Sequence, residues 1–183
     1  MPELVILDRD GVINEDSDDY IRSPEDWVPI PGSLEAIARL NHAGVIVVVA
    51  SNQSGIGRGL FTLRDLNRIH AKFQRALARV GGHVDGIFFC PHPPDAGCEC
   101  RKPAPGLLRS ISLRFSLSLS DVPFIGDTKR DVEAALAARA RPVLVRTGKG
   151  MRSLHEHPGL ARYPWFDDLA AAVEHLFDNR PPI

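Results

Sequence analysis

Two aspartates that follow a short apolar run form the first candidate for chemistry. The run Leu4–Leu7 is too short for a helix and is typical of a buried strand. Asp8 and Asp10 come directly after it, and Gly11 then allows a sharp turn. Alternate residues of an extended chain point the same way, so both carboxylates can face one small volume. Two negative charges so close together repel each other unless a cation neutralises them, and a hard divalent cation with oxygen ligands would do so. On its own, this short motif also fits an acidic turn on the surface.

Polar side chains end two further apolar runs. Ser51 and Asn52 follow the run 45–50, and Asp127 follows the run 122–125. In a parallel sheet, ligands bind beyond the carboxyl ends of the strands, so we expect these residues to gather beside Asp8. Asp127 is then the third acid of a Mg²⁺ site, beside the carboxylate of Asp8 and an oxygen of Asp10.

Lys102 adds the cation that such a site needs. It lies in the sequence Arg101-Lys102-Pro103, and a lysine ammonium is a suitable point charge for a phosphoryl oxygen. Ser51 and Asn52 offer hydroxyl and amide donors. With a carboxylate nucleophile and a metal ion, these are the parts of a phosphoryl-transfer site.

A second metal site is indicated by a cluster of sulfur and imidazole ligands. The three cysteines of the chain, Cys90, Cys98 and Cys100, lie close together with His92. An odd, clustered set is a poor disulfide framework, whereas Cys₃His is a four-coordinate set with no open position. We therefore predict a structural Zn²⁺ in a loop spanning residues 90–100. Zinc would fix the two cations after the last ligand at the mouth of the site, so that Lys102 grips the transferred phosphate and Arg101 reads a second anionic or polar group.

The elements that must position these residues alternate between strand and helix. Strands are expected at 4–7, 45–50, 87–89, 122–125 and 142–145, and helices at 34–40, 66–80, 105–115, 131–139 and 167–177. Thr62 and Ser33 are the expected N-caps, and 147–164 is expected to be a surface excursion. The pattern predicts a doubly wound parallel α/β sheet with helices on both faces, as one domain over residues 1–183 with frayed last residues. The connections leave no room for a large cap domain.

The glycine-rich stretch 55–59 does not have the spacing of a dinucleotide-binding loop. Its glycines are expected either to bring the backbone close to a phosphate or to the zinc loop, or to form a flexible loop. The net charge of −1 argues against nucleic-acid binding. No apolar run is long enough for a bilayer and no signal-peptide pattern is visible, so we expect a cytoplasmic monomer that binds neither membranes nor nucleic acids.

Four segments taken in order, LDRDGVIN, VVVASNQS, RKPAPG and FIGDTKRD, resemble the four signature motifs of the haloacid dehalogenase superfamily of phosphohydrolases. The resemblance implies a Rossmann-like core and a phosphoric monoester hydrolase. It implies that Asp8 becomes an aspartyl-phosphate and that Asp10 protonates the leaving hydroxyl and then activates water. Ser51 and Lys102 would hold the phosphoryl group, and Asp127 would complete the Mg²⁺ site. Asp131 is expected to steady the next helix start or the ligands around it.

The zinc loop in a compact chain, with SNQSGIGRG and VRTGKG, resembles the D-glycero-D-manno-heptose 1,7-bisphosphate 7-phosphatase family of lipopolysaccharide-precursor (ADP-heptose) synthesis. That resemblance implies removal of the 7-phosphate, and recognition of a phosphorylated sugar by Arg101. The substrate-contacting residues that it implies are Asp16, Asp19, Tyr20, Ser51, Asn52, Gln53, Ser54, Arg101 and Lys102. Thr128 stands where some members carry a basic residue that contacts the substrate, so the chain departs from the family's pattern at that position.

The sequence has a feature that argues against each of three alternative functions. Histidinol-phosphate phosphatase has a similar fold and zinc loop, but Ser54 stands where we expect an acid in that family. A polynucleotide phosphatase would need a basic surface. A non-enzymatic, Mg²⁺-dependent phospho-receiver needs neither Asp10 nor a zinc loop, and it would release its phosphate slowly.

Overall fold

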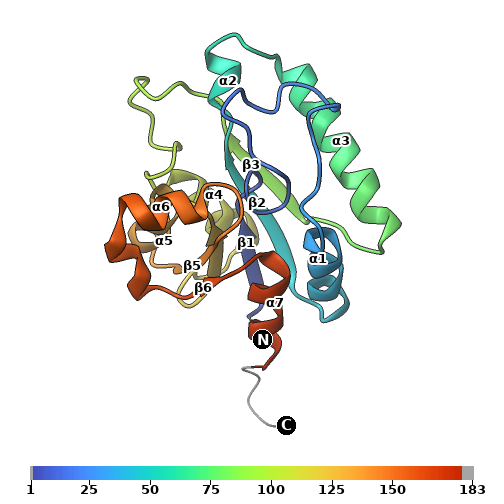
Figure 1. The fold of residues 1–183 in the computed structure, drawn as a ribbon, viewed down its shortest axis with the longest axis vertical. Helices are drawn as coiled ribbons and strands as arrows, with labels where there is room; N and C mark the ends of the chain where they lie inside the picture. The colour runs from blue at the N-terminus through green and yellow to red at the C-terminus, as the bar shows by residue number, and fades with distance from the viewer. Residues whose placement is uncertain (1, 179–183) are drawn as a thin grey trace.

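A six-stranded parallel sheet runs through the centre of the computed structural model, which describes residues 2–178 (Figure 1). The strands are β1 (Leu4–Leu7), β2 (Ile46–Asn52), β3 (Gly86–Cys90), β4 (Pro123–Gly126), β5 (Arg141–Val145) and β6 (Trp165–Phe166), in the order β3-β2-β1-β4-β5-β6. The predicted doubly wound parallel sheet is therefore confirmed. The chain end, expected to be frayed, lies outside the described residues.

The central strands bury both of their faces, which explains why their sequences are apolar throughout. On β1, Val5 and Leu7 belong to one core cluster, whereas Leu4 and Ile6 belong to the other. Successive side chains of a strand point to opposite faces, so a strand between two helix layers needs apolar residues at every position.

Helices cover both faces of the sheet (Figure 1). On one face pack α1 (Ser33–His42), α3 (Leu63–Arg79) and α7 (Leu169–Asp178), and on the other α4 (Gly106–Phe115) and α5 (Lys129–Ala137). The apolar positions of α3 at Leu66, Ile69, Phe73 and Leu77 are buried, as their helical spacing predicts. Thr62 caps this helix through a reciprocal contact with Asp65, also as predicted.

The strand order places a topological switch point at the centre of the sheet. From β1 the chain builds outward through β2 and β3, then crosses to β4 on the other side of β1. The carboxyl ends of β1, β2 and β4 are therefore adjacent, which is where ligands bind in open parallel sheets.

Some local expectations were wrong. Ser51 and Asn52 are the last residues of β2 rather than the start of a loop. The residue before α1 is Gly32 at φ 81°, and the Ser33 hydroxyl donates to the carbonyl of Ile13 (2.7 Å) instead of capping the helix.

The stretch 147–164 is partly regular rather than an excursion, because it contains α6 (Gly150–Glu156) and a 3₁₀ helix, η1 (Pro158–Arg162). β6 was not predicted. It is two residues long, and Trp165 is fixed by donating from Nε1 to the carbonyl of Leu160 (3.0 Å).

The short helix α2 (Ser54–Gly57) follows β2 and approaches the zinc loop. Gly57 N–H donates to the Pro91 carbonyl (2.9 Å), and a Cβ on Gly57 would lie 2.6 Å from Pro93 Cδ. This glycine permits a close backbone approach, which is one of the two roles expected of the stretch. Among residues 2–178, no helix combines the length and apolar character needed to cross a membrane, and no large cap covers the sheet edge.

Candidate active site

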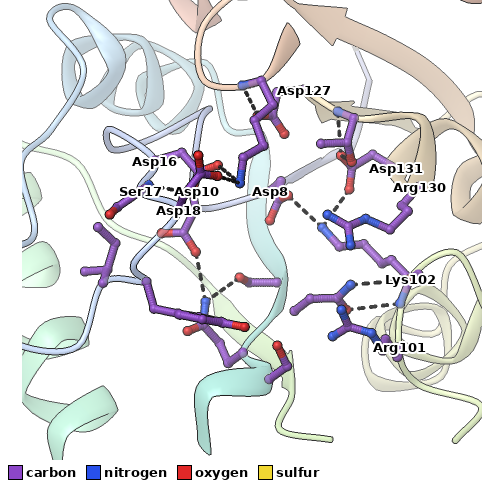
Figure 2. A pocket seen from close by; sticks show the side chains of 18 of the residues that line it. Asp8, Asp10, Asp16, Ser17, Asp18, Arg101, Lys102, Asp127, Arg130 and Asp131 are labelled. Atoms are coloured by element: carbon purple, nitrogen blue, oxygen red, sulfur yellow. Dashed lines mark hydrogen bonds and ion pairs between the residues drawn. The ribbon is translucent and has the colours of Figure 1, made fainter. Parts of the chain in front are cut away.

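Three carboxylates from different segments meet at the switch point. Asp8 follows β1, Asp127 follows β4, and Asp131 lies in the first turn of α5 (Figure 2). One carboxylate oxygen of each lies within 4.8 Å of the others. Gly11, at φ +82°, makes room for this cluster, since a Cβ there would overlap the Asp127 carboxylate. The tight turn after β1 therefore requires glycine.

Lys102 is the buried cation of the cluster. Its Nζ lies 2.8 Å from Asp8 Oδ2 and 2.7 Å from Asp131 Oδ1, and it donates to the Ala50 carbonyl (2.9 Å). The side chain of Asn52 fixes the Lys102 main chain, accepting from its N–H and donating to its carbonyl, both at 3.0 Å. The end of β2 thus positions the lysine that follows the zinc loop.

The charge of this cluster is unbalanced. Burial raises the pKa of Asp8 to about 7, and repulsion from Asp131 and Asp10 adds to this against the attraction of Lys102. Burial, together with Asp131 and Asp8, also raises the pKa of Asp127 well above its usual value. Burial acts in the same direction on Asp131, but Lys102 and the hydrogen bonds from Thr128 keep its pKa below the usual value. One ammonium beside three carboxylates leaves negative charge to be neutralised.

These donors fit a hard divalent cation. They are carboxylate oxygens, close together at the mouth of a cavity, with excess negative charge. Asp131 already serves the start of α5, since its Oδ2 accepts from Thr128 N (2.9 Å) and Thr128 Oγ1 (2.6 Å). Asp8 and Asp127 are thus freer than Asp131 to hold a metal ion, and Asp131 has the helix-start role expected from the sequence.

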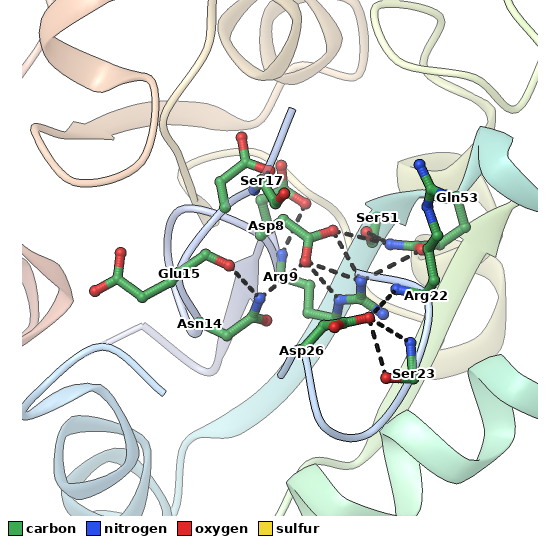
Figure 3. A network of polar contacts seen from close by, with 12 residues as sticks. Asp8, Arg9, Asn14, Glu15, Ser17, Arg22, Ser23, Asp26, Ser51 and Gln53 are labelled. Atoms are coloured by element: carbon green, nitrogen blue, oxygen red, sulfur yellow. Dashed lines mark hydrogen bonds and ion pairs between the residues drawn. The ribbon is translucent and has the colours of Figure 1, made fainter. Parts of the chain in front are cut away.

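Asp10 lies in a separate polar network with Arg9, Asn14 and Gln53, which are labelled in Figure 3. Its Oδ1 accepts from Arg9 Nε (3.0 Å), Arg9 Nη2 (2.8 Å) and Asn14 Nδ2 (2.9 Å). Its Oδ2 accepts from Arg9 Nη2 and Gln53 Nε2, both at 3.0 Å. Gln53 Nε2 also donates to Ser51 Oγ (2.8 Å). The carboxylate of Asp10 is therefore held by three side chains at the edge of the cavity, outside the three-carboxylate cluster.

A cavity of about 300 Å³ opens in front of these groups. In Figure 2 the loop carrying Asp16 and Asp18 lies on one side, and Arg101, Lys102 and Arg130 lie on the other. Lys149 fastens the acidic loop, because its Nζ lies 2.8 Å from Asp16 Oδ2 and 3.1 Å from Asp18 Oδ1. Its main-chain N–H donates to Asp127 Oδ2 (2.7 Å), which ties the loop to the carboxylate cluster.

Three guanidiniums form a basic wall of the cavity: Arg58, Arg101 and Arg130. Within residues 2–178, no carboxylate lies within ion-pair distance of any of them. Arg101 Nη1 is buried without a hydrogen-bond partner. Burial lowers the pKa of Arg101, and the charges of Arg130 and Arg58 contribute to this shift. Cations held together without counter-charge are suited to an anionic ligand.

The cysteine cluster is assembled as expected. The ligand atoms of Cys90, His92, Cys98 and Cys100 all lie within 4.8 Å of one another, and the cysteines are unpaired by disulfides. Cys100 Sγ lies 3.2 Å from Cys90 Sγ and 3.2 Å from His92 Nδ1. Cys₃His with this spacing could hold a tetrahedral metal ion and suits Zn²⁺. The loop leads directly into Arg101 and Lys102, so a metal ion here would fix both cations.

Comparison with known proteins decides the family. The chain is 54% identical over 175 residues to the D-glycero-beta-D-manno-heptose-1,7-bisphosphate 7-phosphatase of Pseudomonas putida, covering 95% of this chain and 99% of the relative. It is 52% identical to the enzyme of that name from Bordetella bronchiseptica, covering 97% and 99% of the two chains. The chain belongs to the heptose bisphosphate phosphatase family. A HAD-hydrolase-like family model also matches residues 99–172.

A solved structure agrees with this family. The D,D-heptose 1,7-bisphosphate phosphatase of B. bronchiseptica, complexed with magnesium and phosphate, has a TM-score of 0.95 and 51% identity to this chain, covering 98% of it and 100% of the relative. The fold expected from the motifs is therefore confirmed as that of a haloacid dehalogenase-like phosphatase, and the heptose bisphosphate phosphatase family expected within it was correctly chosen.

Most site residues expected of this heptose bisphosphate phosphatase family line the cavity. The residues that do so are Asp8, Asp10, Asp16, Tyr20, Ser51, Asn52, Gln53, Ser54, Arg101, Lys102 and Asp127. Asp19 does not line it, and its neighbour Asp18 does. The Asp19 carbonyl instead accepts from Arg22 Nε (2.6 Å), which shapes the loop.

Three cavity-lining cations were not identified from the sequence: Arg58, Arg130 and Lys149. Arg130 follows Asp127 by three residues, at the start of α5, where it can reach the same cavity. Lys149 lies in VRTGKG, which carried the family resemblance without an assigned residue. Arg58 is the C-cap residue that follows α2, and no sequence signal distinguished it from other surface arginines.

Proposed function

We propose that this protein hydrolyses the 7-phosphate of D-glycero-D-manno-heptose 1,7-bisphosphate through an aspartyl-phosphate on Asp8. The observation that carries the proposal is the position of Asp8, which belongs to the carboxylate cluster, pairs with the Lys102 ammonium and lines a cavity with a basic wall. High identity to phosphatases of this name over nearly the whole chain supports the choice of substrate.

Asp8 attacks phosphorus as the nucleophile in the first step. Its Oδ1 accepts from the N–H of Arg9 (2.7 Å) and its Oδ2 is paired with Lys102, so the carboxylate has a fixed orientation. The new bond joins an oxygen of Asp8 to phosphorus, and the bond from phosphorus to the sugar oxygen breaks. Lys102 and the Ser51 hydroxyl face the phosphoryl oxygens, where positive charge and neutral donors stabilise the transition state.

Asp10 moves the protons in both steps. It donates a proton to the departing sugar oxygen, and the resulting carboxylate then takes a proton from the water that attacks the phospho-aspartate. Phosphate leaves, Asp8 is regenerated as a carboxylate, and Asp10 is protonated again.

Asp8 and Asp127 would hold a Mg²⁺ ion. Because the carboxylate of Asp10 is engaged by Arg9, Asn14 and Gln53, the oxygen that Asp10 would contribute is its main-chain carbonyl. Bound Mg²⁺ supplies charge neutralisation and orientation for the phosphoryl group.

The basic wall favours a bisphosphate over histidinol phosphate. Histidinol phosphate carries an ammonium group, and three guanidiniums without counter-charge would repel it. A second phosphate would instead find charge-assisted donors at Arg101, Arg58 and Arg130. Arg58 and Arg130 would thus share the role in substrate recognition that the sequence predicted for Arg101.

Phosphate release from purified enzyme with Mg²⁺ tests the substrate. We expect the highest kcat/KM for the heptose 1,7-bisphosphate, and far lower values for histidinol phosphate and nucleotides. Faster turnover of histidinol phosphate would replace our proposal with that activity. Uptake of a single phosphate without turnover would indicate a phospho-receiver.

Arginine variants test the basic wall. Arg101→Ala and Arg130→Ala should each raise KM for the bisphosphate by about 10-fold or more, because each removes a charge-assisted contact worth about 1.5–3 kcal/mol. KM for heptose 7-phosphate, which lacks the second phosphate, should change little. Lys129→Ala is the matched control, since Lys129 neighbours Arg130 but lies outside the cavity lining. Equal effects on both substrates would refute recognition of a second phosphate by this wall.

A further inference from the structure

The polar network around Asp10 contains a buried arginine. Arg9 is 1% exposed and lies between the two aspartates of the first motif. It does not line the cavity itself, but its guanidinium contacts Asp10 and Gln53, which do (Arg9 and Gln53 are labelled in Figure 3). Within residues 2–178, Asp10 is the sole carboxylate within ion-pair distance of it. Burying a charged guanidinium costs free energy, so a structural or catalytic role is expected for this arginine.

The contacts of Arg9 determine how the Asp10 carboxylate is held. Nε and Nη2 both reach Asp10, and Nη2 contacts both of its oxygens. Gln53 closes the arrangement from the end of β2, because it donates to Asp10 Oδ2 and its Oε1 accepts from Arg9 Nη2 (3.3 Å). Planar donors in a fork define the orientation of a carboxylate, whereas one point charge does not.

We propose that Arg9 is a positioning residue, which together with Gln53 holds Asp10 in the orientation needed for proton transfer to the sugar oxygen and from water. The inference rests on the proposed function, and it assigns to Arg9 a role that acts through Asp10 rather than on the substrate.

Burial makes this arrangement rigid. Separating Arg9 from Asp10 would leave an uncompensated charge in the interior, so the pair stays together through both steps. His70, on α3, does not compete for the carboxylate as a cation. Its ring is 8% exposed, and burial and the nearby charge of Arg9 lower its pKa to about 4, so it is neutral at physiological pH.

The two chemical steps can be separated by the choice of leaving group. A sugar alkoxide needs a proton as it departs, whereas p-nitrophenolate does not. The second step, attack of water on the phospho-aspartate, needs Asp10 as base for either substrate. A misplaced Asp10 should therefore slow both steps with the sugar bisphosphate but only the second step with p-nitrophenyl phosphate.

Arg9→Lys is the main test, because it keeps the positive charge and loses the fork. We expect kcat for the heptose bisphosphate to fall by at least 10-fold, with KM changed less than 3-fold. With p-nitrophenyl phosphate, rapid mixing should show a burst of about one nitrophenolate per active site and then a slow steady state. Arg9→Met should show the same pattern with a larger fall in kcat, on the order of 10²–10³-fold.

Two further variants and one control test whether Arg9 acts through Asp10. Asp10→Asn should reproduce the burst, since it removes the group that Arg9 positions. Gln53→Met leaves the ion pair intact and should give a smaller fall in kcat with the same burst, and it remains informative if Arg9→Met is insoluble. Arg114→Met, a surface arginine distant from the cavity lining, is the control for loss of a guanidinium.

Normal kcat in Arg9→Lys would overturn the proposal, because charge alone would then suffice. The proposal would also be overturned if the burst with p-nitrophenyl phosphate disappeared while the steady-state rate fell. Both steps would then be slowed alike, which indicates general disorder of the site. Failure of the proposed function is separate, since it would appear as absence of bisphosphate turnover in the unaltered enzyme.

Discussion

At the scale of single residues, the site is organised by buried charges that compensate one another incompletely. Lys102 contacts Asp8 and Asp131, whereas Asp127 receives a hydrogen bond from the Lys149 N–H and, within residues 2–178, forms no ion pair. Burying a carboxylate in this state costs free energy, which explains why the pKa values of Asp8 and Asp127 are raised. We expect the same imbalance to favour binding of a divalent cation beside Asp8.

Asp8→Asn separates the chemistry of this residue from its part in the fold. The amide has the same shape but cannot form the aspartyl-phosphate, so we expect hydrolysis to be abolished. Since the raised pKa of Asp8 means that its charged form destabilises the metal-free fold at neutral pH, the melting temperature without Mg²⁺ should not fall. Phosphate release and thermal unfolding measure the two effects. Measurable turnover would overturn the nucleophile assignment.

At the scale of elements, the strand ends were the most predictable part of the site. Apolar runs ended by Asp8, Ser51 and Asp127 implied a common edge, and the parallel sheet brings them together. Arg58, Arg130 and Lys149 could not be assigned in this way, because their positions depend on α2, α5 and the loop before α6. Helix periodicity identifies the buried side of such elements, but it does not identify which surface cation faces a cavity.

Element boundaries failed where tertiary contacts override local preference. Ser33 has the composition of an N-cap, yet its hydroxyl is used by the Ile13 carbonyl and Gly32 precedes the helix. β6 has two residues, too few for a strand pattern, and exists because β5 offers it an edge. Both outcomes depend on segments far away in the sequence, which local patterns do not contain.

The loop from Thr147 to Lys149 should control how the acidic loop borders the cavity. Lys149→Met removes the ammonium that holds Asp16 and Asp18 but keeps the N–H that donates to Asp127. We therefore expect KM to rise several-fold while kcat changes less than 3-fold, as steady-state kinetics can measure. Lys129→Met is the control, since that exposed lysine pairs with Glu133 within α5. A fall in kcat without a change in KM would contradict a substrate-loop role.

The zinc loop makes a separate prediction about the element that carries Arg101 and Lys102. Removing zinc by chelation, with Mg²⁺ then restored, should raise KM for the bisphosphate and lower kcat, because both cations lose their fixed attachment to Cys100. Metal analysis and kinetics should show recovery when Zn²⁺ is added back. Catalysis that is unchanged without zinc would contradict the positioning role of the loop.

At the scale of the whole molecule, the α3 side of the fold buries a titratable ring, that of His70. His70 packs edge-on against Phe89, with ring centroids 6.2 Å apart, and its Nε2 is buried without a hydrogen-bond partner. Arg9 and Asp10 are the charged groups that influence it, and burial is the larger cause of its lowered pKa. Protonation of this ring is therefore linked to unfolding of the molecule rather than to the chemistry at the cavity.

The sign of this linkage predicts how stability changes with pH. The folded pKa of His70 is about 4, against 6.5 for an unperturbed histidine, so the unfolded chain binds more protons between these values. Stability contributed by neutral His70 is present above pH 6.5 and declines as pH falls towards 4. Between pH 7 and pH 5 the free energy of unfolding of the unaltered protein should fall by about 2 kcal/mol because of His70. The His70→Gln variant should lack this loss. Urea unfolding at both pH values, with the exposed His155→Gln as the control, measures the difference, and parallel losses in all three proteins would show that His70 titrates normally in the fold.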